Sequence, residues 1–289
     1  MFSHLQFGGE YFLISEKACD ATSRETGGYS GMSLAPSHFA MNNKFSKIMG
    51  IASAVVLFFL FSLHAGAAGA YEGATVTDGG AIRGKVRLQG ELPPMPPLEV
   101  YKFKEVCKDV PDESLVVGLN FGVRYAVISL EGISRGEEPE REVVNELDNR
   151  DCRFVPHVQA ASVGQWLNLR NSDPILHAAH AVFEAGQPDF NVGLYPGSVR
   201  RKPLASAGLV RIRCEVHPWM IAYIVVTEHP YHAVSDLFGE YELRNVPPGT
   251  YRLKVWHERL GVQVKDVVVR SKGISTVDFL LRMEQGGVK

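Results

Sequence analysis

A cysteine, a histidine and a methionine follow one another at short spacing near the middle of the second half of the chain. Cys214, His217 and Met220 form the pattern C-x2-H-x2-M, between two strand-like segments at 209–214 and 220–227. A thiolate, an imidazole and a thioether on one tight loop suit copper, which takes a second imidazole in the same plane. The sequence therefore predicts a copper site that needs one more histidine from elsewhere.

Two upstream histidines compete for that role. His177 and His180 follow a turn at 171–174, Asn-Ser-Asp-Pro, in which polar side chains cap their own backbone and proline fixes φ. Residues three apart on a regular strand face opposite sides of the sheet, so only one of the pair should point at the metal. The residues alone leave both candidates open.

The segment 154–227 resembles the second half of a cupredoxin, with the short ligand spacing of amicyanins. Members of that family take their first histidine from a loop after an N-x-D-x-x-x-H-like segment, which here is 171–177. The resemblance favours the first of the two histidines and implies one copper ion held by His177, Cys214, His217 and Met220, with His180 as the alternative first ligand.

The sequence departs from the cupredoxin pattern at one position, and the resemblance also implies where a partner protein would dock. Ala178 stands where cupredoxins usually have an asparagine that ties the two ligand loops together, so the groups around the ligands should be built otherwise. In cupredoxins the histidine of the C-terminal loop reaches the surface through an apolar patch where a redox protein docks. Pro218 and Trp219 would supply that patch here.

The elements that must position these ligands read as β-strands. Alternating or β-branched segments separated by turn signals predict an all-β chain of the sandwich or barrel type. The resemblance implies a cupredoxin-like Greek-key β-sandwich, plus a second small β-sandwich. The charged stretch 136–150 is expected to be a surface loop. Strands are expected at 81–88, 124–130, 154–158, 165–169, 209–214 and 220–227, and as a run of short strands within 233–281.

A second resemblance covers the last part of the chain. The segment 236–253 matches D-x-x-G-x-Y-x-L-x-x-V-P-P-G-x-Y-x-L, which resembles carboxypeptidase-regulatory-like domains, a non-catalytic transthyretin-type sandwich, and 80–86 resembles their opening strand. The predicted organisation is an extension at 1–40, a signal peptide at 41–70, an opening strand and Pro-rich connector at 71–106, a cupredoxin-like domain at 107–228 and a regulatory-like sandwich at 229–289.

The N-terminal segment has the three parts of an export signal: a short basic stretch, the apolar run 48–63 and small residues at 68–70. The run is short for a membrane span of roughly 20 residues. We therefore expect a periplasmic or extracellular protein, with an uncleaved anchor at 48–63 as the alternative and membrane contact only in that case.

The other cysteines bear on the kind of metal. Pairing Cys107 with Cys152 would leave Cys214 free as a ligand, as export into an oxidising compartment favours. The competing interpretation is a closed zinc site in which Cys152 and His157 join Cys214 and His217. His229, His232 and His257 are expected to be linker or core histidines.

These patterns favour electron transfer with a redox protein over an enzyme, because the sequence offers neither a second copper ligand set nor a C-x-x-C-H haem motif. A formal net charge of −2 gives no electrostatic footprint for nucleic acid. The alternative function is a non-redox envelope binding or scaffold protein with a structural metal or none.

Overall fold

The structure is a computed structural model that describes residues 70–183 and 190–283. The predicted extension and signal peptide, 1–40 and 41–70, lie almost wholly outside these residues. All of the described residues belong to one compact unit. Among the residues described, no helix is long and apolar enough to cross a membrane.

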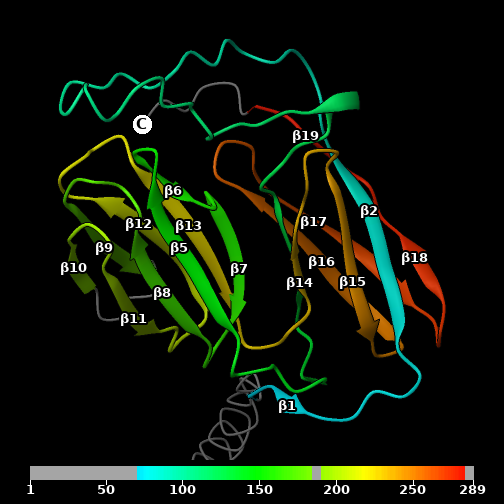
Figure 1. Ribbon diagram of the computed structural model, residues 1–289. Helices are drawn as coiled ribbons and strands as arrows, with labels where there is room; N and C mark the ends of the chain where they lie inside the picture. The colour runs from blue at the N-terminus through cyan, green and yellow to red at the C-terminus, as the bar shows by residue number, and fades with distance from the viewer. Residues whose placement is uncertain (1–69, 184–189, 284–289) are drawn as a thin grey trace, which may run out of the picture. The chain divides into compact units, whose positions relative to one another are not determined.

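The regular secondary structure of the described residues is nearly all β-strand, which confirms the predicted all-β class (Figure 1). Its helical content is one short 3-10 turn, η1, at Leu119–Phe121. The strands are β1 (Glu72–Gly73), β2 (Gly80–Leu88), β3 (Val127–Glu131), β4 (Arg135–Gly136), β5 (Val144–Arg150), β6 (Arg153–Val155), β7 (Val158–Ser162), β8 (Trp166–Asn171), β9 (His177–Phe183), β10 (Phe190–Leu194), β11 (Val199–Pro203), β12 (Gly208–Cys214), β13 (Ile221–Thr227), β14 (His232–Val234), β15 (Glu240–Val246), β16 (Gly249–His257), β17 (Gly261–Val269), β18 (Ile274–Thr276) and β19 (Phe279–Leu281).

Two of the sheets form a sandwich that we call the inserted sandwich. A five-stranded sheet of order β10-β9-β12-β13-β7 lies against a four-stranded sheet of order β11-β8-β5-β6. Side chains from both sheets share one core, which includes Leu147, Leu169, Ile212 and Ile224. In β9, β12 and β13 buried and more exposed residues alternate, as expected where one face of a sheet packs on a core.

The remaining long strands form a second sandwich, the host sandwich. One sheet has the order β14-β3-β16-β17, and in the other β2 pairs with β15, β18 and β19. Ile82, Ile128, Leu253 and Phe279 are buried in the core between them. Gly239, with φ of 75°, ends the turn before β15, where Asp236 caps the backbone N–H groups of Phe238 and Glu240.

The inserted sandwich interrupts the host sandwich in sequence. Strand β3 pairs with β16 and β14, which come after β13 in the chain. The predicted range 107–228 thus includes a strand of the host sandwich, and the inserted sandwich begins at β5 instead. The reason is that β3, with the sequence Val-Ile-Ser-Leu-Glu, is short and mostly buried, and its residues do not show which of the two sandwiches it belongs to.

The expectation of a charged surface loop at 136–150 is wrong for its second half. Strand β5 lies inside the four-stranded sheet, between β6 and β8. Its polar residues Asp148 and Asn149 are buried and hydrogen-bonded: Asp148 accepts from Ser172, and Asn149 donates to the Arg170 carbonyl. The polar residues of β5 made this segment look like a surface loop in the sequence, although their hydrogen-bond partners lie inside the fold.

Candidate metal centre

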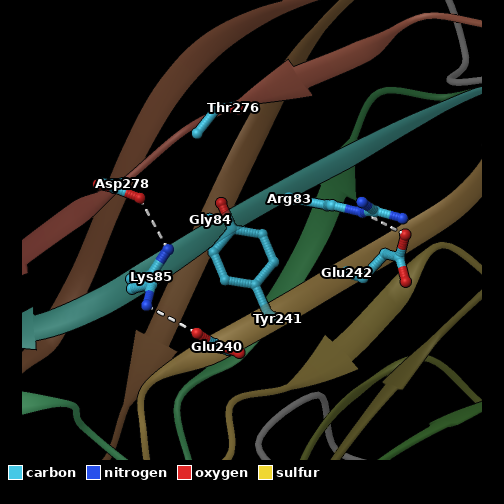
Figure 2. A pocket seen from close by; sticks show the side chains of 8 residues that line it. All are labelled: Arg83, Gly84, Lys85, Glu240, Tyr241, Glu242, Thr276 and Asp278. Carbon is cyan, nitrogen blue, oxygen red and sulfur yellow. Dashed lines mark hydrogen bonds and ion pairs between the residues drawn. The ribbon is translucent and has the colours of Figure 1, made fainter.

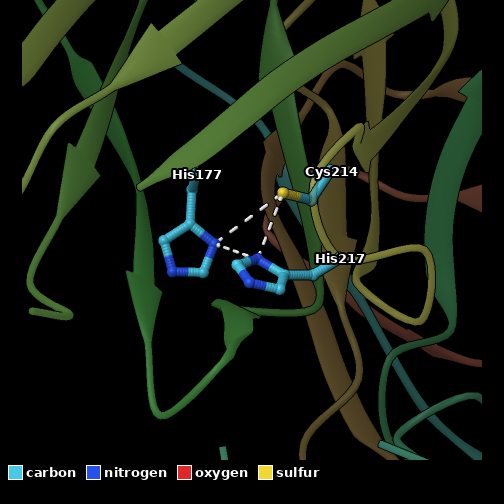
Figure 3. Close-up of side chains that lie close together, drawn as sticks. All are labelled: His177, Cys214 and His217. Atoms are coloured by element: carbon cyan, nitrogen blue, oxygen red, sulfur yellow. Dashed lines mark hydrogen bonds between the residues drawn. The ribbon is translucent and has the colours of Figure 1, made fainter. Parts of the chain in front are cut away.

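Two histidine nitrogens and one cysteine sulfur converge inside the inserted sandwich (Figure 3). The Nδ1 atoms of His177 and His217 lie 3.0 Å apart, and the Cys214 Sγ lies 3.7 Å from the first and 3.6 Å from the second. All three residues are buried. No other group of three His, Cys, Asp or Glu side chains close enough to share a metal ion occurs among the described residues.

The turn between β12 and β13 brings two of these groups together. Cys214 ends β12 on the inward-facing row of that strand, and the chain turns back within six residues to begin β13 at Ile221. The backbone N–H of Met220 donates to the His217 carbonyl, and the Cys214 N–H donates to the Met220 carbonyl. These two bonds close the loop and fix the cysteine and histidine on the same side of it.

Strand β9 supplies the third group. It lies antiparallel to β12 with Ala179 opposite Cys214, and its buried residues alternate with more exposed ones from His177 onward. His177 is therefore on the inner face, while His180 is on the outer face beside Glu215, with Nδ1 to Oε1 of 2.5 Å. The structure places His177, and not His180, at the metal centre.

Asp173 is a site residue that the sequence analysis did not identify. Its Oδ2 lies 3.0 Å from Nε2 of His177, on the ring edge opposite the metal-facing Nδ1. The same carboxylate accepts the backbone N–H groups of Asp151 and Cys152 at 2.7 and 2.9 Å. Asp173 thus orients the histidine, as outer carboxylates do for metal ligands. Its position four residues before His177 could have identified it from the sequence.

Asp173 and His177 each stabilise the charged form of the other. Burial raises the pKa of Asp173, but the hydrogen bonds from His177 and from the two backbone N–H groups outweigh burial, so the pKa is lowered overall. Burial likewise lowers the pKa of His177, and its bonds to Asp173 and Cys214 outweigh that effect, so this pKa is raised. The carboxylate therefore stays ionised beside the imidazole edge that faces it.

The surroundings of Cys214 favour the thiolate form of its side chain. Burial raises its pKa, but hydrogen bonding to His177 and His217 and the Ala178 N–H, 3.4 Å from Sγ, more than offset burial and lower the pKa to about 6. The Glu215 N–H donates to the carbonyl of Ala178. The backbone of Ala178 thus links β9 to the segment that carries Cys214 and His217.

Met220, the predicted axial ligand, is 1% exposed and belongs to the same buried cluster as Cys214. It directly precedes β13, so the loop that holds the cysteine and the histidine also holds the thioether. The structure thus places all four predicted ligands in or beside the core of the inserted sandwich.

The expectation that His217 reaches the surface is wrong. The residue is 0% exposed, because Phe103 and Trp219 pack on its ring with centroid distances of 5.3 and 5.1 Å. Its Nε2 is buried and has no hydrogen-bond partner among the described residues. Of the two predicted docking residues, Pro218 is exposed and Trp219 is partly covered by the Tyr101 ring.

Of the three cysteines among the described residues, Cys107 and Cys152 form a disulfide and Cys214 is free. This pairing overturns the zinc interpretation, which needed Cys152 as a thiolate. The other residue of that interpretation, His157, pairs instead with Glu258 of the host sandwich. His229 and His257 are buried and hydrogen-bonded to backbone groups, in keeping with the expected core role.

The three converging atoms fit a small soft metal ion. An ion that binds nitrogen at about 2.0 Å and a thiolate at about 2.3 Å holds its ligand atoms about 3–4 Å apart. The observed separations of 3.0, 3.6 and 3.7 Å lie in that range. Two imidazoles, one thiolate and a neighbouring thioether form the donor set that copper prefers among the common metals.

A pocket on the host sandwich offers no comparable chemistry (Figure 2). Its charged residues neutralise one another: Arg83 pairs with Glu242, and Lys85 with Glu240. The Tyr241 hydroxyl donates its hydrogen to the Val277 carbonyl.

Comparison with known proteins gives likenesses in structure only. No family model and no curated protein match the chain. A copper-containing nitrite reductase from Thermus scotoductus is 22% identical over 29% of this chain and 22% of its own, with a TM-score of 0.28. A purple cupredoxin from Nitrosopumilus maritimus is 20% identical over 28% of this chain and 98% of its own, with a TM-score of 0.26. A mutant of amicyanin in the Cu(I) form is 18% identical over 34% of this chain and 97% of its own, with a TM-score of 0.27.

Removing the alternative ligand should leave the metal centre intact. We expect His180→Ala to bind copper with unchanged affinity, because the side chain lies on the outer face of β9 and pairs with Glu215. Titration of the metal-free protein in competition with a chelator measures this, with His177→Ala as the comparison that removes a converging nitrogen. A loss of affinity in His180→Ala equal to that in His177→Ala would show that the ligands are assigned wrongly.

Proposed function

We propose that the inserted sandwich is a cupredoxin-like domain with a mononuclear copper centre that carries single electrons between protein partners. The observation that carries this proposal is the convergence of two Nδ1 atoms and one low-pKa thiol in a buried pocket. Copper bound there supplies a one-electron couple between Cu(I) and Cu(II). The electron comes from a reduced partner protein and passes to an oxidised one, so no bond is made or broken.

Each residue has a distinct part in this proposal. Cys214 would provide the thiolate, His177 and His217 would provide the imidazoles, and Met220 would provide a weaker thioether ligand. Asp173 holds the first imidazole so that Nδ1 faces the metal. The ligands lie on two strands and a loop closed by backbone bonds, so the pocket keeps one geometry in both oxidation states.

The setting of the centre is also proposed. The disulfide Cys107–Cys152 supports a periplasmic or extracellular location, because such bonds persist in oxidising compartments. We assign the host sandwich to the transthyretin-type, regulatory-like class because the turn at Asp236–Gly239 and strands β15 and β16 fall where that motif requires them. Its part is to support the inserted sandwich rather than to catalyse a reaction.

An optical spectrum together with metal analysis tests the function. The oxidised protein loaded with copper is expected to bind one ion per chain and to show an intense thiolate-to-copper band in the visible region. Cys214→Ser should lose the band, and His180→Ala should keep it as the matched control. Absence of the band, or its persistence in Cys214→Ser, would refute the copper centre, and a protein that takes up no metal would support a binding or scaffold role.

A further inference from the structure

One loop of the chain lies over the metal centre without contributing a ligand. This loop, 98–110, is closed at its ends by a hydrogen bond from the Leu98 N–H to the Val110 carbonyl. Within it, the Phe103 carbonyl accepts the N–H groups of Val106 and Cys107. A compact segment of this length with adjoining ends is an Ω-loop, a type of loop that often has a functional role. We call it the cap.

The inner side of the cap touches the second imidazole of the centre. The Phe103 ring meets His217 edge-on, with centroids 5.3 Å apart and planes at 73°. The Tyr101 ring meets Trp219 in the same way at 5.7 Å, and Trp219 in turn packs on His217 with centroids 5.1 Å apart. These aromatic rings bury the histidine completely, including its unpartnered Nε2.

The base of the cap is fastened to the body of the inserted sandwich. Cys107 of the cap is joined to Cys152, which lies between β5 and β6, and the indole N–H of Trp219 donates to the Cys152 carbonyl at 3.1 Å. Val110 is buried beside the disulfide, with Leu98 and Ile175 packed against the same cluster. The cap is therefore held by a covalent bond at one point and by apolar contacts around it.

The backbone of the cap is held in an unusual conformation at the residue that meets the metal centre. Phe103 has φ of 53°, in the left-handed region that a bulky residue seldom adopts. Such conformations persist where the surrounding structure enforces them, and they cluster at functional sites. Phe103 is 44% exposed, so burial of its ring is not a sufficient reason for it to occupy this position.

We propose that the cap closes the metal pocket against small ligands from solvent. The centre would then exchange electrons with partners that remain outside it, and it would not bind a small substrate at the metal as a copper enzyme does. This inference rests on the proposed function for its metal, but the closure of the pocket is a property of the protein alone. Phe103 is the positioning residue of the closure, because its ring is the part of the cap that lies against His217.

Chemical labelling of the full-length, metal-free protein tests the closure directly. Diethyl pyrocarbonate modifies exposed imidazole nitrogens, and peptide mass spectrometry reports the rate at each histidine. We expect His217 in the folded protein to react at least about tenfold more slowly than in the urea-unfolded chain, because the cap must open first. Phe103→Ala should remove most of that protection. The matched control, Phe238→Ala, truncates a phenylalanine that is 50% exposed in the host sandwich and should not alter the rate.

Buried histidines in the host sandwich distinguish opening of the cap from unfolding. His257 should stay protected in every folded variant, since it is buried in the host sandwich at the end of β16 and the cap does not include its strand. Equal rates at His217 in the folded and unfolded wild-type protein would overturn the proposal, as would full protection in Phe103→Ala. If that variant does not fold, the wild-type comparison alone decides between the outcomes.

The copper-loaded protein gives a second measurement. Azide added to the oxidised protein should leave the visible spectrum of the wild type and of Phe238→Ala unchanged, and should shift that of Phe103→Ala. A shift in the wild type would show an open site and overturn the closure. If the protein takes up no copper, the proposed function fails, while the labelling of His217 still reports whether the pocket is closed.

Discussion

Asp173→Asn is expected to lower the affinity for copper by about 10- to 100-fold, the usual loss when an outer carboxylate of a ligating histidine is removed. The amide keeps the size of the side chain but loses the negative charge that faces Nε2 of His177. An amide can also present its NH2 group to the ring and favour the wrong tautomer. Titration of metal-free protein against a chelator of known affinity measures the change.

Asp236→Asn is the matched control for this prediction. Asp236 also accepts two backbone N–H groups with one carboxylate, but it does so in the host sandwich, with no metal ligand as a partner. Both substitutions should reduce stability through the weakened turn, and only Asp173→Asn should reduce copper affinity. Equal affinity in the two variants would mean that Asp173 supports the β5–β6 turn without orienting His177.

Removal of the disulfide is expected to lower the free energy of unfolding by about 4 kcal/mol, within the usual range of about 2–5 kcal/mol. The bond joins residues 45 apart in sequence, and cross-linking a loop of that length restricts the unfolded chain strongly. The double variant Cys107→Ser, Cys152→Ser should therefore unfold at a lower denaturant concentration. Urea unfolding of the metal-free protein, extrapolated linearly to water, measures the difference.

Two controls separate the cross-link from other effects of losing sulfur. Cys214→Ser removes the buried free thiol and leaves the disulfide in place, so it reports the cost of a buried polar substitution alone. Unfolding the wild type in the presence of a dithiol reductant should reproduce the loss seen in the double variant. An unchanged unfolding midpoint in the double variant would show that contacts around Val110 and Ile175 hold the cap by themselves.

The parts of the site that lie close together in sequence could be predicted, because a tight loop fixes their geometry. Cys214, His217 and Met220 share such a loop. Strand alternation predicts that only one of His177 and His180 faces the site, and the structure shows that it is His177. The all-β class follows in the same way from local patterns and turns. Asp173 was within reach too, since it precedes its histidine by four residues.

Other parts depend on contacts that no local pattern encodes. Phe103 is distant from His217 in the chain, and nothing around it in sequence indicates that its ring covers an imidazole. Strand β5 looks polar in sequence, but Asp148 accepts from Ser172 and the Asn149 amide N–H donates to the Arg170 carbonyl inside the fold. Strand β3 could pair in either sandwich, and its partners are set by the later strands β14 and β16.

Because one sandwich is inserted into the other in sequence, the two sandwiches should fold in a definite order. Strand β2 pairs with β18 and β19, so the host sandwich joins an early segment of the chain to a very late one. The strands of the inserted sandwich lie closer together in sequence, and contacts between near segments form sooner than those that close long loops. The inserted sandwich, with its metal pocket, should thus fold before β18 and β19 pair with β2. The host sandwich is then completed last.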